Sequence, residues 1–162
     1  MHKGITLIEL LVVIAIIGIL ASAAMPFARM TVQRTKELDL RRNLRILRTA
    51  IDEFKKDCDH IPPILSKLEG YCKSEQSNYP ESLEQLTEPL KLSGALDRTK
   101  KYLRRIPRDP MTALESSDNP NNWGLRSYGD EPDSNDWGGG NVYDVYPKSE
   151  VISLDGTMYN TW

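Results

Sequence analysis

Few residues of this 162-residue chain could carry out chemistry, and most kinds of active site can be set aside. The two histidines, His2 and His60, lie far apart in sequence, so neither histidine catalysis nor a multi-histidine metal site is expected. The sequence shows no Ser-His-Asp set and no phosphate-binding glycine loop. Asp109 and Asp144 suit structural caps as well as any other role. The sequence therefore does not predict an enzyme.

One segment gathers carboxylates and glycines. Between Gly129 and Gly140 lie Asp130, Asp133 and Asp136. Hard cations such as Ca²⁺ take about six to eight oxygen ligands from carboxylates and backbone carbonyls, and glycines let carbonyls converge. The spacing is not that of an EF-hand. The loop is either a calcium site with these three aspartates as ligands or a solvated acidic turn.

The two cysteines, Cys58 and Cys72, lie close together in sequence. In an exported chain such a pair favours a disulfide. A redox-active pair would more typically be CxxC. A structural disulfide is therefore expected, in a loop that follows a long helix.

The main apolar run, Ile5 to Met25, lies near the amino end and contains one ionisable group, Glu9. As a helix it would span about 30 Å, the thickness of a bilayer core. One interpretation is a cleaved secretory signal with Lys3 in its n-region and a small-residue site at Ala21–Ala23. A second is a plain membrane anchor, in which a lone carboxylate costs about 2.5–3.5 kcal/mol on insertion scales. Neither interpretation explains why a carboxylate, Glu9, stands within the apolar run.

The third interpretation comes from a resemblance. The stretch Lys3-Gly4-Ile5-Thr6-Leu7-Ile8-Glu9 resembles the class III signal of type IV prepilins and type II secretion pseudopilins. The resemblance implies cleavage by a prepilin peptidase between Gly4 and Ile5, methylation of Ile5, and retention of the apolar helix as anchor and filament core. Glu9 would then meet the Ile5 amine of a neighbouring copy. A buried pair of that kind sets register.

The flanking charges oppose this orientation. Lys3 precedes the apolar run, whereas five basic residues follow it, and positive-inside bias would place the basic flank in the cytoplasm. Long domains translocate largely regardless of charge, so the resemblance takes precedence. The basic residues after the run are Arg29, Arg34, Lys36, Arg41 and Arg42.

The long helix is expected to continue past the apolar run. Gly18 and Pro26 interrupt it and predict a kink, and the resemblance implies that the segment between them can unwind in a filament. Beyond Pro26, a stripe at helical spacing predicts packing on the globular domain: Leu40, Leu44, Leu47, Ile51 and Phe54. The helix should end near Asp57, before Pro62 and Pro63. Four arginines, Arg41, Arg42, Arg45 and Arg48, favour a solvated or subunit-packing face over a nucleic-acid stripe.

The rest of the chain predicts a small domain. Ile64–Leu68 suggests a helical turn, Tyr79–Leu86 a short helix containing Leu83 and Leu86, and Tyr102–Pro110 a turn. Strands are expected at Trp123–Tyr128 and Val142–Tyr146, with a hairpin from Val151 to Tyr159 around Asp155-Gly156. About three antiparallel strands should pack on the helix. The segments Tyr79–Leu86, Tyr102–Pro110 and Leu154–Trp162 resemble elements of type II secretion major pseudopilins, which also bind calcium in this region.

Together these features predict an α+β chain with the type IV pilin-like fold, a long N-terminal helix packed on a small antiparallel sheet. Its parts would be a leader (1–4), a membrane and polymerisation half-helix (5–26), an amphipathic half-helix (27–57) and a periplasmic domain (58–162). The resemblance implies a structural subunit of a type II secretion pseudopilus, with a type IV pilus subunit for adhesion, motility or DNA uptake as the alternative. An anchored periplasmic enzyme is a third class.

The implied partners are copies of itself, other pseudopilins, prepilin peptidase, the inner-membrane assembly platform and, before assembly, membrane lipid. Nucleic acid is not expected, and calcium is the implied cofactor. The implied location is the inner membrane, in a single pass, with the N-terminus cytoplasmic and the domain periplasmic.

Overall fold

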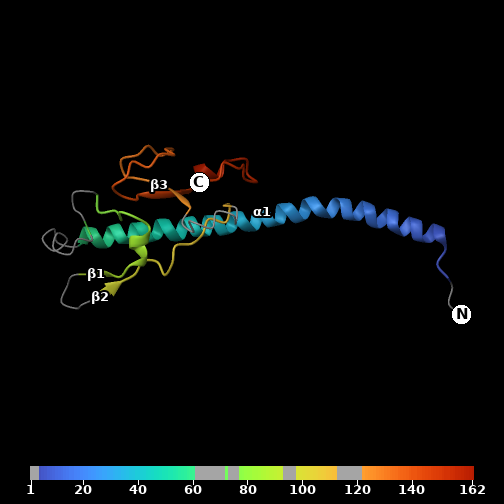
Figure 1. Cartoon of the computed structure of the whole chain (residues 1–162), viewed down its shortest axis with the longest axis horizontal. Helices are drawn as coiled ribbons and strands as arrows, with labels where there is room; N and C mark the ends of the chain where they lie inside the picture. The colour runs from blue at the N-terminus through green and yellow to red at the C-terminus, as the bar shows by residue number, and fades with distance from the viewer. Residues whose placement is uncertain (1–3, 61–71, 73–76, 93–97, 113–121) are drawn as a thin grey trace. The chain divides into compact units, whose positions relative to one another are not determined.

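The structure is a computed structural model, and it describes residues 4–60, 72, 77–92, 98–112 and 122–162. The chain divides into two compact units, Met1–Lys36 and Glu37–Trp162. Helix α1 runs over Leu7–His60 (Figure 1). The other elements are η1 (Glu84–Thr87), β1 (Leu90–Leu92), β2 (Arg98–Lys100), β3 (Trp123–Arg126), β4 (Asp144–Pro147) and η2 (Tyr159–Thr161).

The second half of α1 supplies one wall of the core. All five side chains of the predicted stripe are buried, which confirms the prediction from their spacing. Ala50 and Cys58 continue the same face. The helix ends at His60 rather than near Asp57. From the other elements the core receives Leu83, Leu86, Leu90, Leu103, Trp123, Val142, Val145 and Tyr159.

The described strands form two separate antiparallel pairs rather than one sheet of about three strands. In the first, β1 pairs with β2 through Leu90↔Lys100 and Leu92↔Arg98, a pairing that was not predicted. In the second, β3 pairs with β4 through Trp123↔Pro147 and Arg126↔Asp144. Both members of the second pair were predicted, although each strand is shorter than expected. The fold is α+β, as predicted.

The β3–β4 pair is held by a close contact across the ladder. Gly124 lies opposite Tyr146, and a Cβ at Gly124 would lie 2.2 Å from an atom of the tyrosine ring. The ring therefore covers the glycine backbone directly. On the same face Arg126 stacks over Tyr146 at 4.2 Å, and the Tyr146 hydroxyl donates to the Asn135 carbonyl at 2.8 Å.

The β1–β2 hairpin is tied to α1 by charge. Lys100 Nζ lies 2.8 Å from Asp57 Oδ2, and the Tyr102 hydroxyl donates to the same oxygen at 2.8 Å. Burial alone would raise the pKa of Asp57, but these two hydrogen bonds outweigh it and lower that pKa. Asp57 is thus an anchor for the hairpin near the end of the helix.

The carboxyl-terminal hairpin has a wider turn than predicted. Ser153 N donates to the Thr157 carbonyl at 2.8 Å, and Gly156 N donates to the Ser153 carbonyl at 3.1 Å. Gly156 has a φ of +88°, which suits a three-residue loop with glycine in the left-handed region rather than a two-residue turn. The pairing beyond it is a single bridge, Ile152↔Met158.

Two more of the predicted elements differ in outcome. The segment Tyr79–Leu86 forms only the short 3-10 helix η1, and Leu83 precedes that helix instead of lying within it. The helical turn expected at Ile64–Leu68 lies outside the described residues.

Candidate assembly helix and its supporting network

The amino end of α1 begins at a threonine cap. Glu9 N donates to Thr6 Oγ1 at 3.3 Å, and Leu10 N donates to the Thr6 carbonyl at 3.1 Å. Thr6 and Glu9 have the Thr-x-x-Glu spacing of a capping box. This spacing is readable in the sequence, but the cap was not among the predictions. Thr6 fixes where the helix starts and places Glu9 in its first turn.

The predicted cleavage bond lies in exposed chain just before the helix. Gly4 and Ile5 precede α1, and Ile5 is 77% exposed. A Cβ added at Gly4 would meet no atom within 4 Å, so packing does not require glycine there. The bond between Gly4 and Ile5 is therefore open to a peptidase in this structure.

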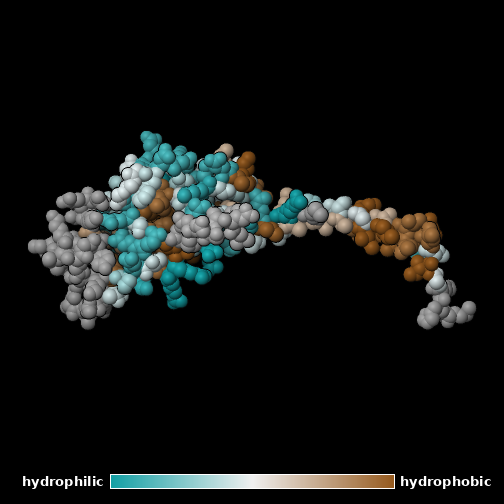
Figure 2. Space-filling view, viewed as in Figure 1, coloured by the Kyte–Doolittle hydropathy of each residue, from teal (hydrophilic) through white to brown (hydrophobic). Residues whose placement is uncertain are grey.

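The apolar part of α1 is exposed on all sides. Its large side chains from Ile5 to Leu20 are between 46% and 77% exposed. Figure 2 shows this stretch as the hydrophobic end of the helix. By length and composition α1 could cross a membrane, and no other helix of the described residues could. A helix that is apolar all round requires lipid or other helices around it.

Gly18 and Pro26 both lie inside α1. Near them two hydroxyls bond back to the helix, Ser22 Oγ to the Ile19 carbonyl at 2.7 Å and Thr31 Oγ1 to the Phe27 carbonyl at 2.9 Å. Proline leaves one helical carbonyl without its donor. Kinking at these residues and unwinding between them stay predictions.

The four arginines of the second half of α1 do not act as one surface. Arg48 Nε donates to Asp144 Oδ1 at 2.7 Å, and Arg48 Nη2 donates to the carbonyls of Val145 at 3.2 Å and Trp162 at 2.8 Å. Arg48 therefore fastens β4 and the carboxyl-terminal residue to the helix. Arg41 also faces the domain, whereas Arg42 and Arg45 are exposed. The prediction of a solvated or subunit-packing face was wrong for Arg48.

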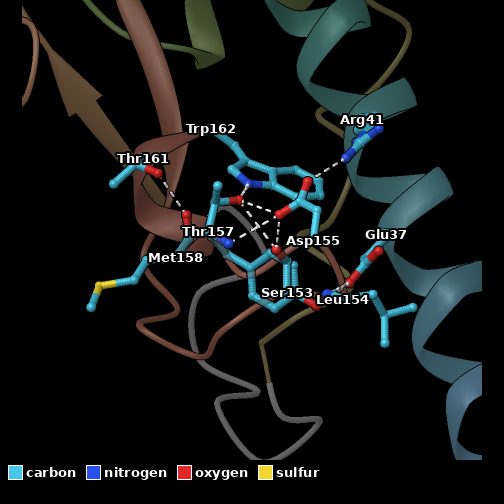
Figure 3. A network of polar contacts seen from close by, with 10 residues as sticks. Glu37, Arg41, Ser153, Leu154, Asp155, Thr157, Met158, Thr161 and Trp162 are labelled. Atoms are coloured by element: carbon cyan, nitrogen blue, oxygen red, sulfur yellow. Dashed lines mark hydrogen bonds and ion pairs between the residues drawn. The ribbon is translucent and has the colours of Figure 1, made fainter.

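A second polar network holds the carboxyl-terminal hairpin against α1 (Figure 3). The Glu37 carboxylate is 8% exposed, and its Oε1 accepts from Leu154 N at 2.8 Å and from the Tyr159 hydroxyl at 2.7 Å. Glu37 stands three residues before Leu40, on the buried stripe. An acidic residue at a stripe position is the sequence signal that could have revealed it.

Asp155 organises the turn itself. Its Oδ1 accepts from the hydroxyls of Ser153 and Thr157, the latter at 2.6 Å, and from Thr157 N at 3.0 Å. Its Oδ2 accepts from Arg41 Nη2 at 3.1 Å, and the Arg41 guanidinium lies 4.3 Å from the Trp162 ring centre. The hydrogen bonds from Ser153 and Thr157 lower the pKa of Asp155 to about 2.

The predicted calcium ligands are not brought together. Asp130 Oδ2 accepts from Ser127 N at 2.6 Å and Gly138 N at 3.1 Å, bonds that close the loop and lower the pKa of Asp130. No group of three or more histidine, cysteine, aspartate or glutamate side chains that could hold a metal occurs among the described residues. Binding of calcium by Asp130, Asp133 and Asp136 stays a prediction.

Cys58 and Cys72 form a disulfide, with a Cα–Cα distance of 5.6 Å. Both cysteines are buried in the core beside α1. The bond fixes Cys72 to the last turns of α1, and a disulfide between this pair was predicted from the sequence.

The amino-terminal residues also match a known family. The prokaryotic N-terminal methylation motif matches residues 1–25, a range that includes Gly4, Ile5, Glu9 and Gly18. The chain carries the N-methylation motif of type IV pilin-like proteins. With this motif on a helix that could span a membrane, the chain fits a single-pass membrane anchor.

Relatives extend this pilin-like similarity beyond the motif. The chain is 28% identical over 154 residues to the type II secretion system core protein G of Dickeya chrysanthemi, covering 86% of this chain and 89% of that protein. It is 28% identical over 109 residues to the core protein G of Escherichia coli, covering 67% and 66%. It is 35% identical over 78 residues to the type IV major pilin protein PilA of Myxococcus xanthus, covering 48% of this chain and 35% of that pilin.

The matched part thus spans about a third of the Myxococcus pilin and most of the Dickeya core protein G. No solved structure matches the chain significantly.

Proposed function

We propose that this chain is a structural subunit of the periplasmic pseudopilus of a type II secretion system, and not an enzyme. The observation that carries the proposal is the similarity to core protein G over 86% of the chain, which includes the globular domain as well as the methylation motif. In this function the subunit polymerises through α1, and growth of the filament drives protein export.

The chemistry of assembly follows from Gly4, Ile5 and Glu9. Cleavage after Gly4 by a prepilin peptidase would leave a cationic amine on Ile5, which is then methylated. In a filament core the Glu9 carboxylate would be costly without a partner, because a buried unpaired charge destabilises strongly. The Ile5 amine of a neighbouring copy is the partner that fits. Each copy would then fix the axial position of the next.

The exposed apolar half of α1 would contact lipid before assembly and other helices after assembly. Before assembly the helix lies in the inner membrane in contact with lipid, with the N-terminus in the cytoplasm and the domain in the periplasm. The assembly platform then extracts it, and helices of other copies and of other pseudopilins replace the lipid. Calcium bound by the loop 129–140 would stabilise the domain.

The alternative is a type IV pilus subunit for adhesion, motility or DNA uptake. The similarity to the Myxococcus pilin supports it, because its identity of 35% is higher although its coverage is smaller. Filaments that extend beyond the cell surface would favour the pilus. Filaments confined to the periplasm at native expression would favour the pseudopilus.

The first test is the intact mass and N-terminal sequence of the protein purified from membranes, with and without prepilin peptidase. We expect a mature chain that begins at methylated Ile5 only when the peptidase is present. An uncleaved chain, or one cut near Ala23, would remove the polymerisation argument and leave an anchored or exported domain.

A further inference from the structure

The carboxyl-terminal hairpin displays large apolar side chains to solvent. Val151 is 61% exposed, Ile152 58%, Leu154 45% and Met158 50%. Ile152 and Met158 are paired at the bridge, so their side chains belong to one small surface. We name these four residues the hairpin patch. Contiguous exposed apolar side chains in a soluble domain mark surfaces that other molecules cover.

The hairpin patch is rigidly supported. Its turn has one bridge and no regular strand pairing, yet Asp155 receives three hydrogen bonds from within the turn and one from Arg41. Glu37 holds Leu154 N from the helix side. A surface held in one conformation loses little conformational entropy on binding. The supporting network thus preorganises the patch for a contact.

A second exposed apolar surface lies on α1 just beyond Pro26. Phe27 is 70% exposed and Met30 is 58% exposed. They are three residues apart and so share one face of the helix. They follow the continuous apolar run and stand among polar residues such as Arg29, Gln33 and Arg34. A membrane core would not surround this turn fully.

The two surfaces also complement each other in charge. The segment 149–162 contains Glu150 and no Lys or Arg, and its other carboxylate, Asp155, is already paired with Arg41. The segment 10–36 contains Arg29, Arg34 and Lys36 and no Asp or Glu. A carboxylate beside one apolar surface and basic residues beside the other favour their association and its orientation. Glu150 would be repelled by anionic lipid headgroups, which argues against a membrane surface as the partner.

We propose that the hairpin patch of one copy docks on the Phe27 and Met30 turn of a second copy. The two surfaces differ, so the contact is heterologous and propagates along a filament. Four side chains are too few for a stable dimer, because specific interfaces bury on the order of 1,200 Å² or more. The contact therefore forms only inside the filament, and in this respect it rests on the proposed function.

The test uses the full chain, assembled in cells that contain the secretion machinery. The double variant Met158→Cys/Met30→Cys is oxidised in filaments released from the periplasm, while the native cysteines remain in their own disulfide. We expect a ladder of covalent multimers, since every copy carries both halves of the contact. The matched control is Tyr128→Cys/Met30→Cys, because Tyr128 is 61% exposed but lies outside the hairpin patch. It should give no ladder.

A third variant reports on the apolar contact itself. Adding Ile152→Lys to the Met158→Cys/Met30→Cys chain should lower the multimer yield about tenfold, the effect of roughly one lost apolar side chain. Adding Tyr128→Lys should leave the yield unchanged. Three results would overturn the contact and leave the proposed function standing, provided that filaments pellet normally. They are the absence of a ladder, a disulfide within one copy only, and an equal ladder with the control pair. Absence of filaments from the wild-type chain would overturn both.

Discussion

The buried hydrogen bond between Tyr159 and Glu37 gives a quantitative prediction. The Tyr159 side chain is 1% exposed and its hydroxyl donates to Glu37 Oε1 at 2.7 Å. A hydrogen bond to a charged group contributes about 1.5–3 kcal/mol. Tyr159→Phe removes the donor, while Oε1 keeps its bond from Leu154 N. No acceptor is orphaned, so we expect the lower part of that range, about 1.5–2 kcal/mol.

For a domain of this size, a loss of about 1.5–2 kcal/mol in the free energy of unfolding lowers the melting midpoint by about 6–8 °C. The measurement is thermal unfolding of the full chain in mild detergent, followed by near-ultraviolet circular dichroism. This signal reports the tryptophans of the globular domain and not the apolar helix, which detergent keeps folded. Tyr128→Phe is the matched control, because that side chain is 61% exposed and should change stability by less than about 0.5 kcal/mol.

A double-mutant cycle assigns the effect to the charged acceptor. In a Glu37→Gln chain the acceptor is neutral, so the further cost of Tyr159→Phe should fall to about 0.5–1.5 kcal/mol. If Tyr159→Phe costs no more than Tyr128→Phe, or if its cost is the same with glutamine at position 37, the argument from the buried carboxylate is refuted.

Four further predictions concern other parts of the chain. Glu9→Val should leave membrane insertion intact but abolish or disorder filaments in electron micrographs, and normal filaments would count against the pairing with the Ile5 amine. Replacing both Cys58 and Cys72 by serine should lower the free energy of unfolding by about 3 kcal/mol, the chain-entropy value for a loop of this length, as measured in denaturant; an unchanged midpoint would contradict it. The pKa of Asp155 is lowered from 3.8 to about 2, so its contribution is present above about pH 4 and is lost as pH falls to about 2; the stability difference between wild type and Asp155→Asn should shrink over that interval, and a constant difference would exclude this carboxylate. Calcium should raise the melting midpoint and a chelator should lower it, through Asp130, Asp133 and Asp136, whereas a midpoint unmoved by either would defeat the calcium prediction.

The helical part of the fold could be predicted because its signals are local and periodic. The spacing from Leu40 to Phe54 leaves one consistent face, and every member of it is buried. The methylation motif is a contiguous pattern and was equally readable. The disulfide followed from two cysteines close in sequence.

The strand pairing was harder to predict because its signals are weak or distant. We missed β1 and β2 because each has only three residues: Leu-Lys-Leu is too short for its alternation to stand out, and Arg-Thr-Lys has no apolar residue. Asp155-Gly156 has the composition of a two-residue turn, but the hydroxyls of Ser153 and Thr157 bind the Asp155 carboxylate and the loop takes three residues.

The ion pair between Arg48 and Asp144 could not be predicted from the sequence for a different reason. Arg48 and Asp144 stand far apart in sequence, and only the folded chain shows that one neutralises the other. An arginine in a run of arginines gives no sign of which one turns inward. Sequence spacing assigns a side chain to a face of a helix, but it does not say what will lie opposite that face.

The contact of Gly124 with Tyr146 has a consequence for how this domain can diverge. Because the ring lies where a Cβ would be, even alanine at position 124 would have to displace the ring from Arg126 and from the Asn135 carbonyl. The loop that follows β3 would lose the hydrogen bond from Tyr146 to the Asn135 carbonyl. A side chain at position 124 therefore requires a smaller residue at position 146, and a library that varies position 124 alone would return glycine.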